Sequence, residues 1–141
     1  MIKGERIRGI GTDFLSIRRL EATLQRRGDS FVQHMLTRRE IRDLQSRRGG
    51  GYFGTLAGRR TLAGRICAKE AVVKSAGTGL SQGLTWHDVE VFNAPSGSPW
   101  ISVSSKAKEL WGTGKFMISI SHCQEYANAF ALCLEEGEGG V

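Results

Sequence analysis

The chain has 141 residues, 40% of them hydrophobic and 24% charged, so it is long enough to bury a core but short for two domains. We expect one domain over residues 1–141. No apolar run approaches the roughly 18 residues of a membrane helix, which argues against a membrane-spanning protein and predicts a soluble one. Twenty Lys and Arg against 14 Asp and Glu give a net charge of +6. This excess favours an anionic partner, whether nucleic acid, a phosphorylated ligand or an acidic protein.

The positions of the basic residues and the cysteines give information on the binding surface, the class of protein and its compartment. Most of the basic excess precedes Lys74, in arginine pairs such as those at 18–19, 26–27 and 38–39. Three cysteines, an odd number without CxxC spacing, argue against a disulfide scaffold and a structural zinc site. Reduced thiols and the lack of a recognisable signal sequence favour a cytoplasmic location, with an organelle matrix as the alternative.

The first part of the chain predicts a strand followed by a helix. Residues 6–13 alternate weakly between apolar and polar or small side chains, as a short strand ending at Asp13 would. Ser16 is placed to cap a helix that continues through Leu24 and ends near Gly28.

A second helix is predicted by a capping-box pattern. Thr37 and Glu40 have the spacing of a capping box, so we expect a helix over residues 37–47. The run Gly49–Gly51 predicts a mobile loop rather than a phosphate cradle, because no GK[ST] motif follows it.

The second half of the chain predicts a long helix and four strands. Residues 55–76 lack proline and are rich in Ala, Leu, Arg and Lys, which indicates one long helix with Gly77 in its C-cap. The remaining elements expected are strands over 87–94 and 99–104 around a PSGS turn, a short helix over 106–110 capped by Ser104 or Ser105, and strands over 116–122 and 126–134. This order predicts an α+β fold with a small, mainly antiparallel sheet packed on a long central helix.

Three charged residues are candidates for a metal and phosphate site. Asp13 ends the first predicted strand, and Glu70 and Lys74 lie one turn apart on one face of the long helix. Each has an ordinary structural interpretation, a turn aspartate for Asp13 and a surface ion pair for the other two. Together they would suit a diphosphate bound through Mg²⁺, which commonly takes only one or two protein carboxylates.

His122 is a weaker candidate. It follows the apolar strand FMISIS, where an imidazole could contact a phosphate or donate a proton near neutral pH. A strand-terminal histidine bonded to a backbone carbonyl is the alternative interpretation.

Three segments, in this order, closely resemble the holo-acyl-carrier-protein synthases, a group of 4′-phosphopantetheinyl transferases. They are GIGTDFLSI at 9–17, AGRICAKEAVVKSAGTGL at 63–80 and ISISHCQEYANA at 118–129. The stretch LTWHDVEVFNAPSGSPWISVSSKAKEL at 84–110 resembles the family's hairpin and short helix. The resemblance covers nearly the whole chain and implies transfer of phosphopantetheine from coenzyme A to a serine of an apo-acyl carrier protein, in fatty-acid or polyketide synthesis.

The resemblance also assigns roles to residues. It implies that Asp13 and Glu70 hold Mg²⁺, that Lys74 contacts the coenzyme A phosphates, and that Glu70 and Lys74 are catalytic. The residues expected to shape the coenzyme A pocket are Arg65, Gly77, Gly79, Ser121 and His122.

The family further implies a homotrimer with active sites between subunits. A basic first helix would dock the acidic carrier, and Arg19 and Arg26 match that helix best. The chain departs from the family pattern at Ile66-Cys67 and Cys123-Gln124, and in an arginine-rich insertion that contains the three glycines.

Two other functions are compatible with parts of the sequence. The arginine pairs would suit a nucleic-acid-binding module, but no exposed aromatics are interleaved with them and no zinc-finger or RNP-like element is present. A carrier-binding scaffold without catalysis would not need Asp13, Glu70 and Lys74 together. We therefore expect neither nucleic acid nor a membrane as a partner.

Overall fold

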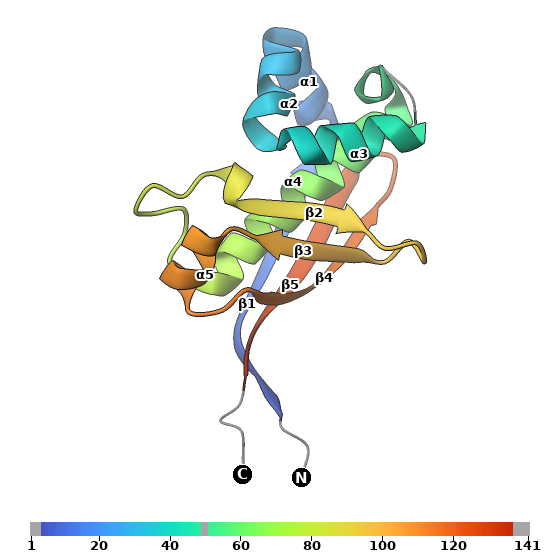
Figure 1. Cartoon of the computed structure of the whole chain (residues 1–141). Helices are drawn as coiled ribbons and strands as arrows, with labels where there is room; N and C mark the ends of the chain where they lie inside the picture. Colours follow the sequence, from blue (N-terminus) through green and yellow to red (C-terminus); the bar gives the residue numbers. More distant parts are fainter. Residues whose placement is uncertain (1–3, 49–50, 137–141) are drawn as a thin grey trace.

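The computed structural model describes residues 4–48 and 51–136, so Gly49 and Gly50 of the predicted loop lie outside the described residues. One strand begins the chain, most of the helices follow it, and the other four strands lie in the second half (Figure 1). In order they are β1 (Glu5–Ser16), α1 (Ile17–Arg27), α2 (Asp29–Met35), α3 (Arg38–Arg48), η1 (Tyr52–Gly54), α4 (Leu56–Ala76), η2 (Trp86–Asp88), β2 (Val89–Asn93), β3 (Pro99–Val103), α5 (Ser105–Trp111), β4 (Lys115–His122) and β5 (Tyr126–Glu136).

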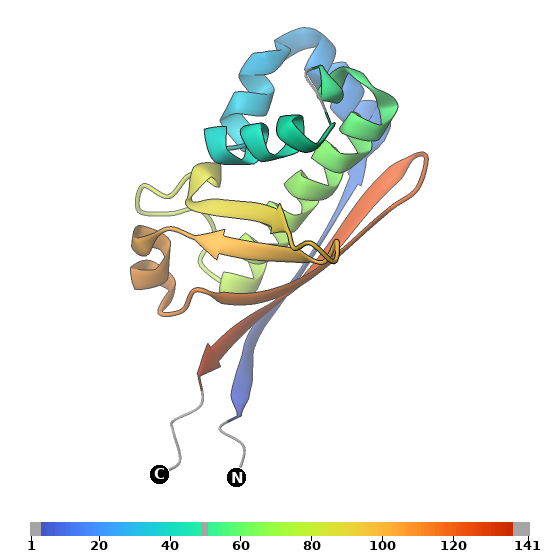
Figure 2. The ribbon, with the colours of Figure 1, turned by 45° about the vertical axis from the view of Figure 1, so that its right-hand side comes forward.

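The predicted α+β fold is confirmed, with the strands divided between two antiparallel sheets. One sheet has the strand order β1-β5-β4, and the other is the β2–β3 hairpin. Helix α4 runs between them, while α1, α2 and α3 form a layer at one end (Figures 1 and 2). The long central helix is therefore the element that every other layer contacts.

Helix α4 is buried on almost all sides, which its sequence permits because its side chains are small or aliphatic. Leu62, Ala63, Ala68, Ala71 and Val72 are fully buried in the core. The Thr55 hydroxyl caps its first turn by accepting a hydrogen bond from the Gly58 N–H at 3.0 Å. At the other end, Gly77 has φ = 88°, the left-handed conformation predicted for a C-cap glycine.

Strand β1 lies unusually close to α4 at two glycines. A Cβ atom at Gly9 would lie 1.9 Å from the carbonyl oxygen of Ser75, and one at Gly11 would lie 2.0 Å from that of Ala71. Because only glycine allows this approach, β1 is held directly against the helix that carries Glu70.

The predicted caps are confirmed at the other helices. The Ser16 hydroxyl accepts a hydrogen bond from the Arg19 N–H, and the Ser104 hydroxyl accepts one from the Ala107 N–H. Thr37 and Glu40 form the expected capping box.

In the first 35 residues one prediction was wrong and one helix was not predicted. Strand β1 continues to Ser16, so Asp13 lies within it opposite Ala129 rather than at its end. Residues 29–35 form a separate helix, α2, because Gly28 with φ = 57° turns the chain and a new helix begins immediately after it.

Among residues 4–48 and 51–136 there is no helix with the length and apolar character needed to cross a membrane.

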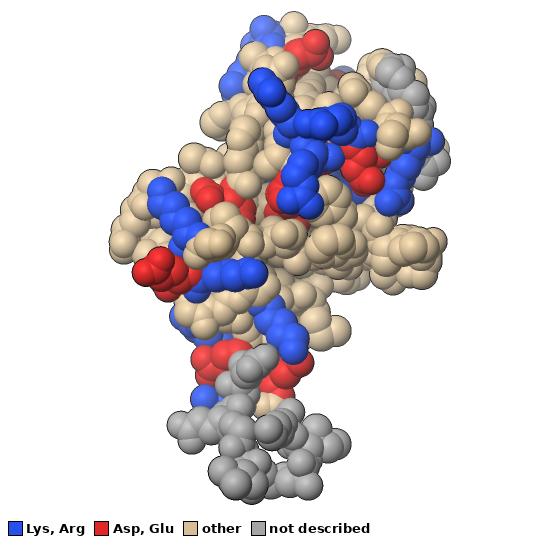
Figure 3. All heavy atoms as spheres, viewed as in Figure 1, with Lys and Arg blue, Asp and Glu red and all other residues tan. Residues whose placement is uncertain are grey.

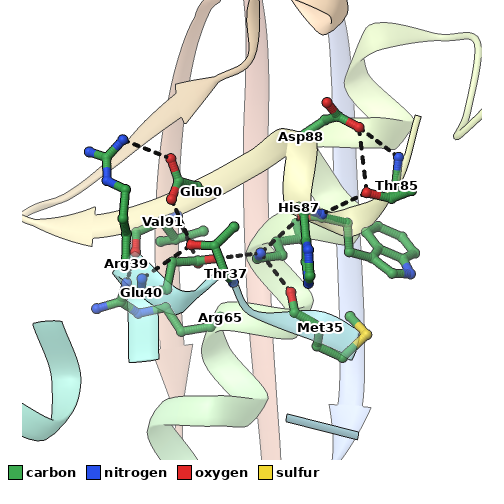
Figure 4. Close-up of polar contacts among 12 residues, drawn as sticks. Met35, Thr37, Arg39, Glu40, Arg65, Thr85, His87, Asp88, Glu90 and Val91 are labelled. Atoms are coloured by element: carbon green, nitrogen blue, oxygen red, sulfur yellow. Dashed lines mark hydrogen bonds and ion pairs between the residues drawn. The ribbon is translucent and has the colours of Figure 1, made fainter. Parts of the chain in front are cut away.

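Asp88 should make the stability of the fold depend on pH. Its carboxylate accepts a hydrogen bond from the Thr85 N–H at 2.8 Å (Figure 4). It also accepts one from the Ser104 hydroxyl at 2.7 Å. Burial opposes its ionisation, but these hydrogen bonds outweigh burial and lower the pKa of Asp88 below its ordinary 3.8. The stabilisation is present above the unfolded pKa and is lost as pH falls through the folded one.

We expect Asp88→Asn to lower the free energy of unfolding at neutral pH, and the difference from the unaltered chain to shrink as the pH falls below about 4. Urea unfolding at several pH values measures this. A difference that stays constant with pH would contradict the assignment.

Candidate active site

The first cluster of predicted site residues lies where β1 packs on α4. The Lys74 ammonium donates hydrogen bonds to the Thr12 carbonyl oxygen at 2.9 Å and to Asp13 Oδ1 at 3.2 Å. Glu70, one turn before Lys74, lies close enough to Asp13 for the two charges to interact. The structure therefore brings Asp13, Glu70 and Lys74 together.

The electrostatics of this cluster suit a bound cation. Burial raises the pKa of Glu70, the negative charge of Asp13 raises it further, and Lys74 opposes them. Cys67 lies beside the same carboxylates, and burial together with the charge of Asp13 and a hydrogen bond to it raises the pKa of its thiol to about 12. Cys67 is therefore a neutral thiol under ordinary conditions, and the oxygen donors of the cluster are the two carboxylates.

The donors available in this cluster fit Mg²⁺ better than a structural metal. In the part of the chain that the structure describes, no group of three or more His, Cys, Asp or Glu side chains is arranged to hold a metal. Two carboxylates, with the remaining positions left to water and substrate phosphate, are the set that Mg²⁺ commonly uses.

A second cluster surrounds a cavity of about 460 Å³ on the opposite side of α4. Three basic residues, Arg47, Arg65 and His122, line it together with Asn93 and the turn between β2 and β3. Their side chains would favour a phosphorylated ligand. The two predicted pocket residues Arg65 and His122 are thus brought together.

Arg65 is held firmly within this second cluster. Its side chain is almost fully buried, and its guanidinium donates to the Val91 carbonyl oxygen and to Asn93 Oδ1. Arg47 ion-pairs with Asp43 at 3.2 Å and donates to the Asn93 carbonyl oxygen at 3.3 Å. Sequence reasoning missed Arg47 and Asn93, since an arginine pair and a strand-terminal asparagine carry no spacing signal of their own.

The two clusters do not meet within one chain. Asp13 lies on β1 and His122 on β4, and β5 separates these strands, which places their backbones roughly 10 Å apart. Glu70 and Arg65 are five residues apart on α4, so they point in directions that differ by roughly 140° around the helix.

The remaining predicted site residues lie on three different parts of the fold. Gly77 and Gly79 follow α4 with φ values of 88° and 69°, at the Lys74 end of the helix. Ser121 is exposed near the end of β4. Arg19 and Arg26 are exposed two turns apart on α1, in the helical layer over which basic side chains gather in Figure 3.

The model of the 4′-phosphopantetheinyl transferase superfamily matches residues 9–133 of this sequence. The chain belongs to this superfamily. Its similarity to a holo-[acyl-carrier-protein] synthase of Protochlamydia amoebophila is 41% identity over 124 residues, covering 88% of this chain and 95% of that protein. The similarity therefore extends over nearly the whole length of both proteins.

Solved structures of acyl carrier protein synthases share the fold. An acyl carrier protein synthase of Plasmodium yoelii with ADP bound has a TM-score of 0.80 and 29% identity, covering 96% of this chain and 99% of that one. A holo-[acyl-carrier-protein] synthase of Helicobacter pylori in complex with coenzyme A has a TM-score of 0.72 and 26% identity, covering 88% of this chain and 99% of that one.

Proposed function

We propose that this chain is a holo-acyl-carrier-protein synthase, which transfers 4′-phosphopantetheine from coenzyme A to a serine of an apo-acyl carrier protein in fatty-acid biosynthesis. The observation that carries the proposal is the meeting of Asp13, Glu70 and Lys74 where β1 packs on α4. These three residues lie in two of the three segments by which the sequence resembles its family. The three cysteines, all within the described residues, are unpaired, which supports a reducing compartment such as the cytoplasm.

The reaction exchanges one phosphorus–oxygen bond for another. The serine oxygen attacks the β-phosphorus of coenzyme A, the bond from that phosphorus to the bridging oxygen breaks, and adenosine 3′,5′-bisphosphate leaves. Asp13 and Glu70 would hold Mg²⁺, which when bound neutralises diphosphate charge. The Lys74 ammonium would stabilise charge on the departing phosphate. The serine proton must also leave, and either Glu70 or a water molecule would accept it.

The decisive experiment measures the product directly. The chain is incubated with coenzyme A, Mg²⁺ and an apo carrier, and the carrier is weighed by mass spectrometry. We expect a mass increase equal to one phosphopantetheine arm, lost when Mg²⁺ is removed with a chelator. No increase with several different carriers would refute the proposed activity.

The separation of the two clusters supports a homotrimer with sites shared between subunits. The outward face of the β1-β5-β4 sheet carries Ile10, Phe14, Met117 and Phe130, which are 40–63% exposed. An apolar face of this kind is typical of an interaction surface. Packing it against neighbouring copies could bring the basic cavity of one subunit to the carboxylates of the next.

Mixing two inactive variants tests this arrangement. Glu70→Ala removes a carboxylate from one cluster, and His122→Glu places a negative charge in the other. If a site combines Glu70 of one subunit with His122 of another, co-refolding the two variants in equal amounts should restore about a quarter of the original activity. Activity assays on the mixture and on each variant alone measure this, and a mixture as inactive as its components would contradict shared sites.

The carrier should dock on α1. An acidic carrier would be attracted to exposed Arg19 and Arg26, and reversing both charges should raise the carrier KM about tenfold at low salt and less at high salt. The kcat should change little, because neither residue belongs to the two clusters. The double variant Lys106→Glu/Lys108→Glu on α5 changes the net charge equally and is the control. An unchanged carrier KM in the Arg19 and Arg26 variant would remove α1 from the docking surface.

A further inference from the structure

A buried ion pair connects α4 to the layer of α2 and α3. The side chains of Lys69 and Glu40 are both fully buried, and Lys69 Nζ lies 2.6 Å from Glu40 Oε1. The ammonium also donates to the carbonyl oxygens of Met35 at 2.7 Å and Trp86 at 3.0 Å. All three of its donors therefore have partners, and one lysine joins the end of α2, the start of α3 and η2.

The carboxylate of Glu40 extends this network to strand β2 (Figure 4). Its Oε1 also accepts the Thr37 N–H at 2.9 Å, and its Oε2 accepts the Val91 N–H at 3.0 Å. Burying an ion pair generally stabilises a fold no more than well-packed apolar residues of similar volume would. The pair is therefore better explained by the position it gives to β2 than by stability.

Both backbone polar groups of Val91 are hydrogen-bonded to charged side chains. Its N–H is bonded to Glu40, and its carbonyl oxygen accepts a hydrogen bond from Arg65. Arg65 also binds Asn93 Oδ1, and Asn93 Nδ2 donates to the Gly97 carbonyl oxygen at 2.8 Å. Arg65, Asn93 and Gly97 all line the basic cavity, so the path from the buried carboxylate to the cavity wall is continuous.

We propose that Glu40, held by Lys69, is a positioning residue for the end of coenzyme A that carries the adenosine bisphosphate. It fixes β2 at Val91 and thereby sets the places of Arg65, Asn93 and the turn between β2 and β3. This role rests on the proposed function, because it assigns the basic cavity to the nucleotide end of coenzyme A. Glu40 itself does not reach the cavity, so it acts only through the groups that it holds.

Two variants remove the network in different ways. Glu40→Gln keeps the shape of the side chain but replaces one carboxylate oxygen with an amide nitrogen. That nitrogen cannot accept the hydrogen bond that the oxygen accepted. The double variant Glu40→Leu/Lys69→Met replaces the whole pair with apolar side chains of similar volume, which buried sites often tolerate without unfolding. Val32→Ala, a core change in α2, is the control for general loss of stability.

The readout is the affinity for adenosine 3′,5′-bisphosphate, measured by calorimetry at a temperature where every variant is folded. We expect both Glu40 variants to bind it about tenfold more weakly and to raise the coenzyme A KM by a similar factor. Losing the partner that orients a metal ligand commonly costs about ten- to a hundredfold, and we expect the lower end of that range here. The carrier KM should stay within about twofold. Val32→Ala should change neither the affinity for the bisphosphate nor the coenzyme A KM.

Failure of this role and failure of the proposed function give different results. If the unaltered chain transfers phosphopantetheine and binds the bisphosphate, but both Glu40 variants bind it equally well, the positioning role is wrong and the function stands. If the unaltered chain neither binds the bisphosphate nor modifies a carrier, the proposed function falls and this role falls with it.

Discussion

Glu70→Ala should lower the turnover of coenzyme A and carrier by about a thousandfold or more, since neutralising the charge of a reacting diphosphate is worth several kcal/mol. Glu70 contributes one of the two carboxylates in the cluster with Lys74. The variant should still bind adenosine 3′,5′-bisphosphate, because the basic cavity lies on the other side of α4. Steady-state assays combined with calorimetry of nucleotide binding would separate these two effects.

The control for this prediction is Glu109→Ala, an exposed glutamate on α5 away from both clusters. It should keep full activity, and circular dichroism should show both variants folded. Near-normal turnover of Glu70→Ala in excess Mg²⁺ would mean that the carboxylate cluster is not the reaction site.

Gly11→Ala should lower the free energy of unfolding by about 3 kcal/mol or more, at the upper end of the usual cost of overpacking. Its new methyl group would lie 2.0 Å from the Ala71 carbonyl oxygen and 2.8 Å from the Ser75 nitrogen, and neither backbone atom can move without shifting α4. Any retreat of β1 would also carry Asp13 away from Glu70. We therefore expect urea unfolding at a lower midpoint together with reduced transfer activity.

Gly54→Ala provides a matched comparison. A Cβ atom at Gly54 meets nothing within 4 Å, so this variant should be nearly as stable as the unaltered chain. A Gly11→Ala variant within about 1 kcal/mol of Gly54→Ala would show that β1 and α4 are not packed as closely as the structure indicates.

Local chemistry explains why so much of the fold could be predicted. Ser16, Thr37, Ser104 and Gly77 each act on backbone groups a few residues away, so a short window of sequence contains the whole signal. Helix α2 was missed because a glycine followed by an aspartate ends a helix and can also begin one. The division into two sheets depends on pairing between distant strands, which local patterns do not specify.

The candidate site, like the fold, could be predicted from the sequence only where the signal is local. Glu70 and Lys74 are one helical turn apart, so their shared face followed from spacing alone. Asp13 could be grouped with them by residue type, but no local spacing places it beside them. That Arg65 faces away from Glu70 could have been read from their separation along a helix. The roles of Arg47, Asn93 and Glu40 depend on where β2 crosses α4 and α3, which is a property of the folded chain.

Strand β5, which lies between β1 and β4, has a consequence for how the chain behaves at low concentration. Each copy carries the carboxylate cluster on one side of this strand and the basic cavity on the other, and in the proposed trimer these belong to two different sites. A dissociated copy would therefore bind nucleotide but not catalyse the transfer. Specific activity should therefore fall on dilution below the concentration at which the copies associate, while the affinity for nucleotide persists. In this arrangement the amount of enzyme would set both the number of sites and whether they are complete.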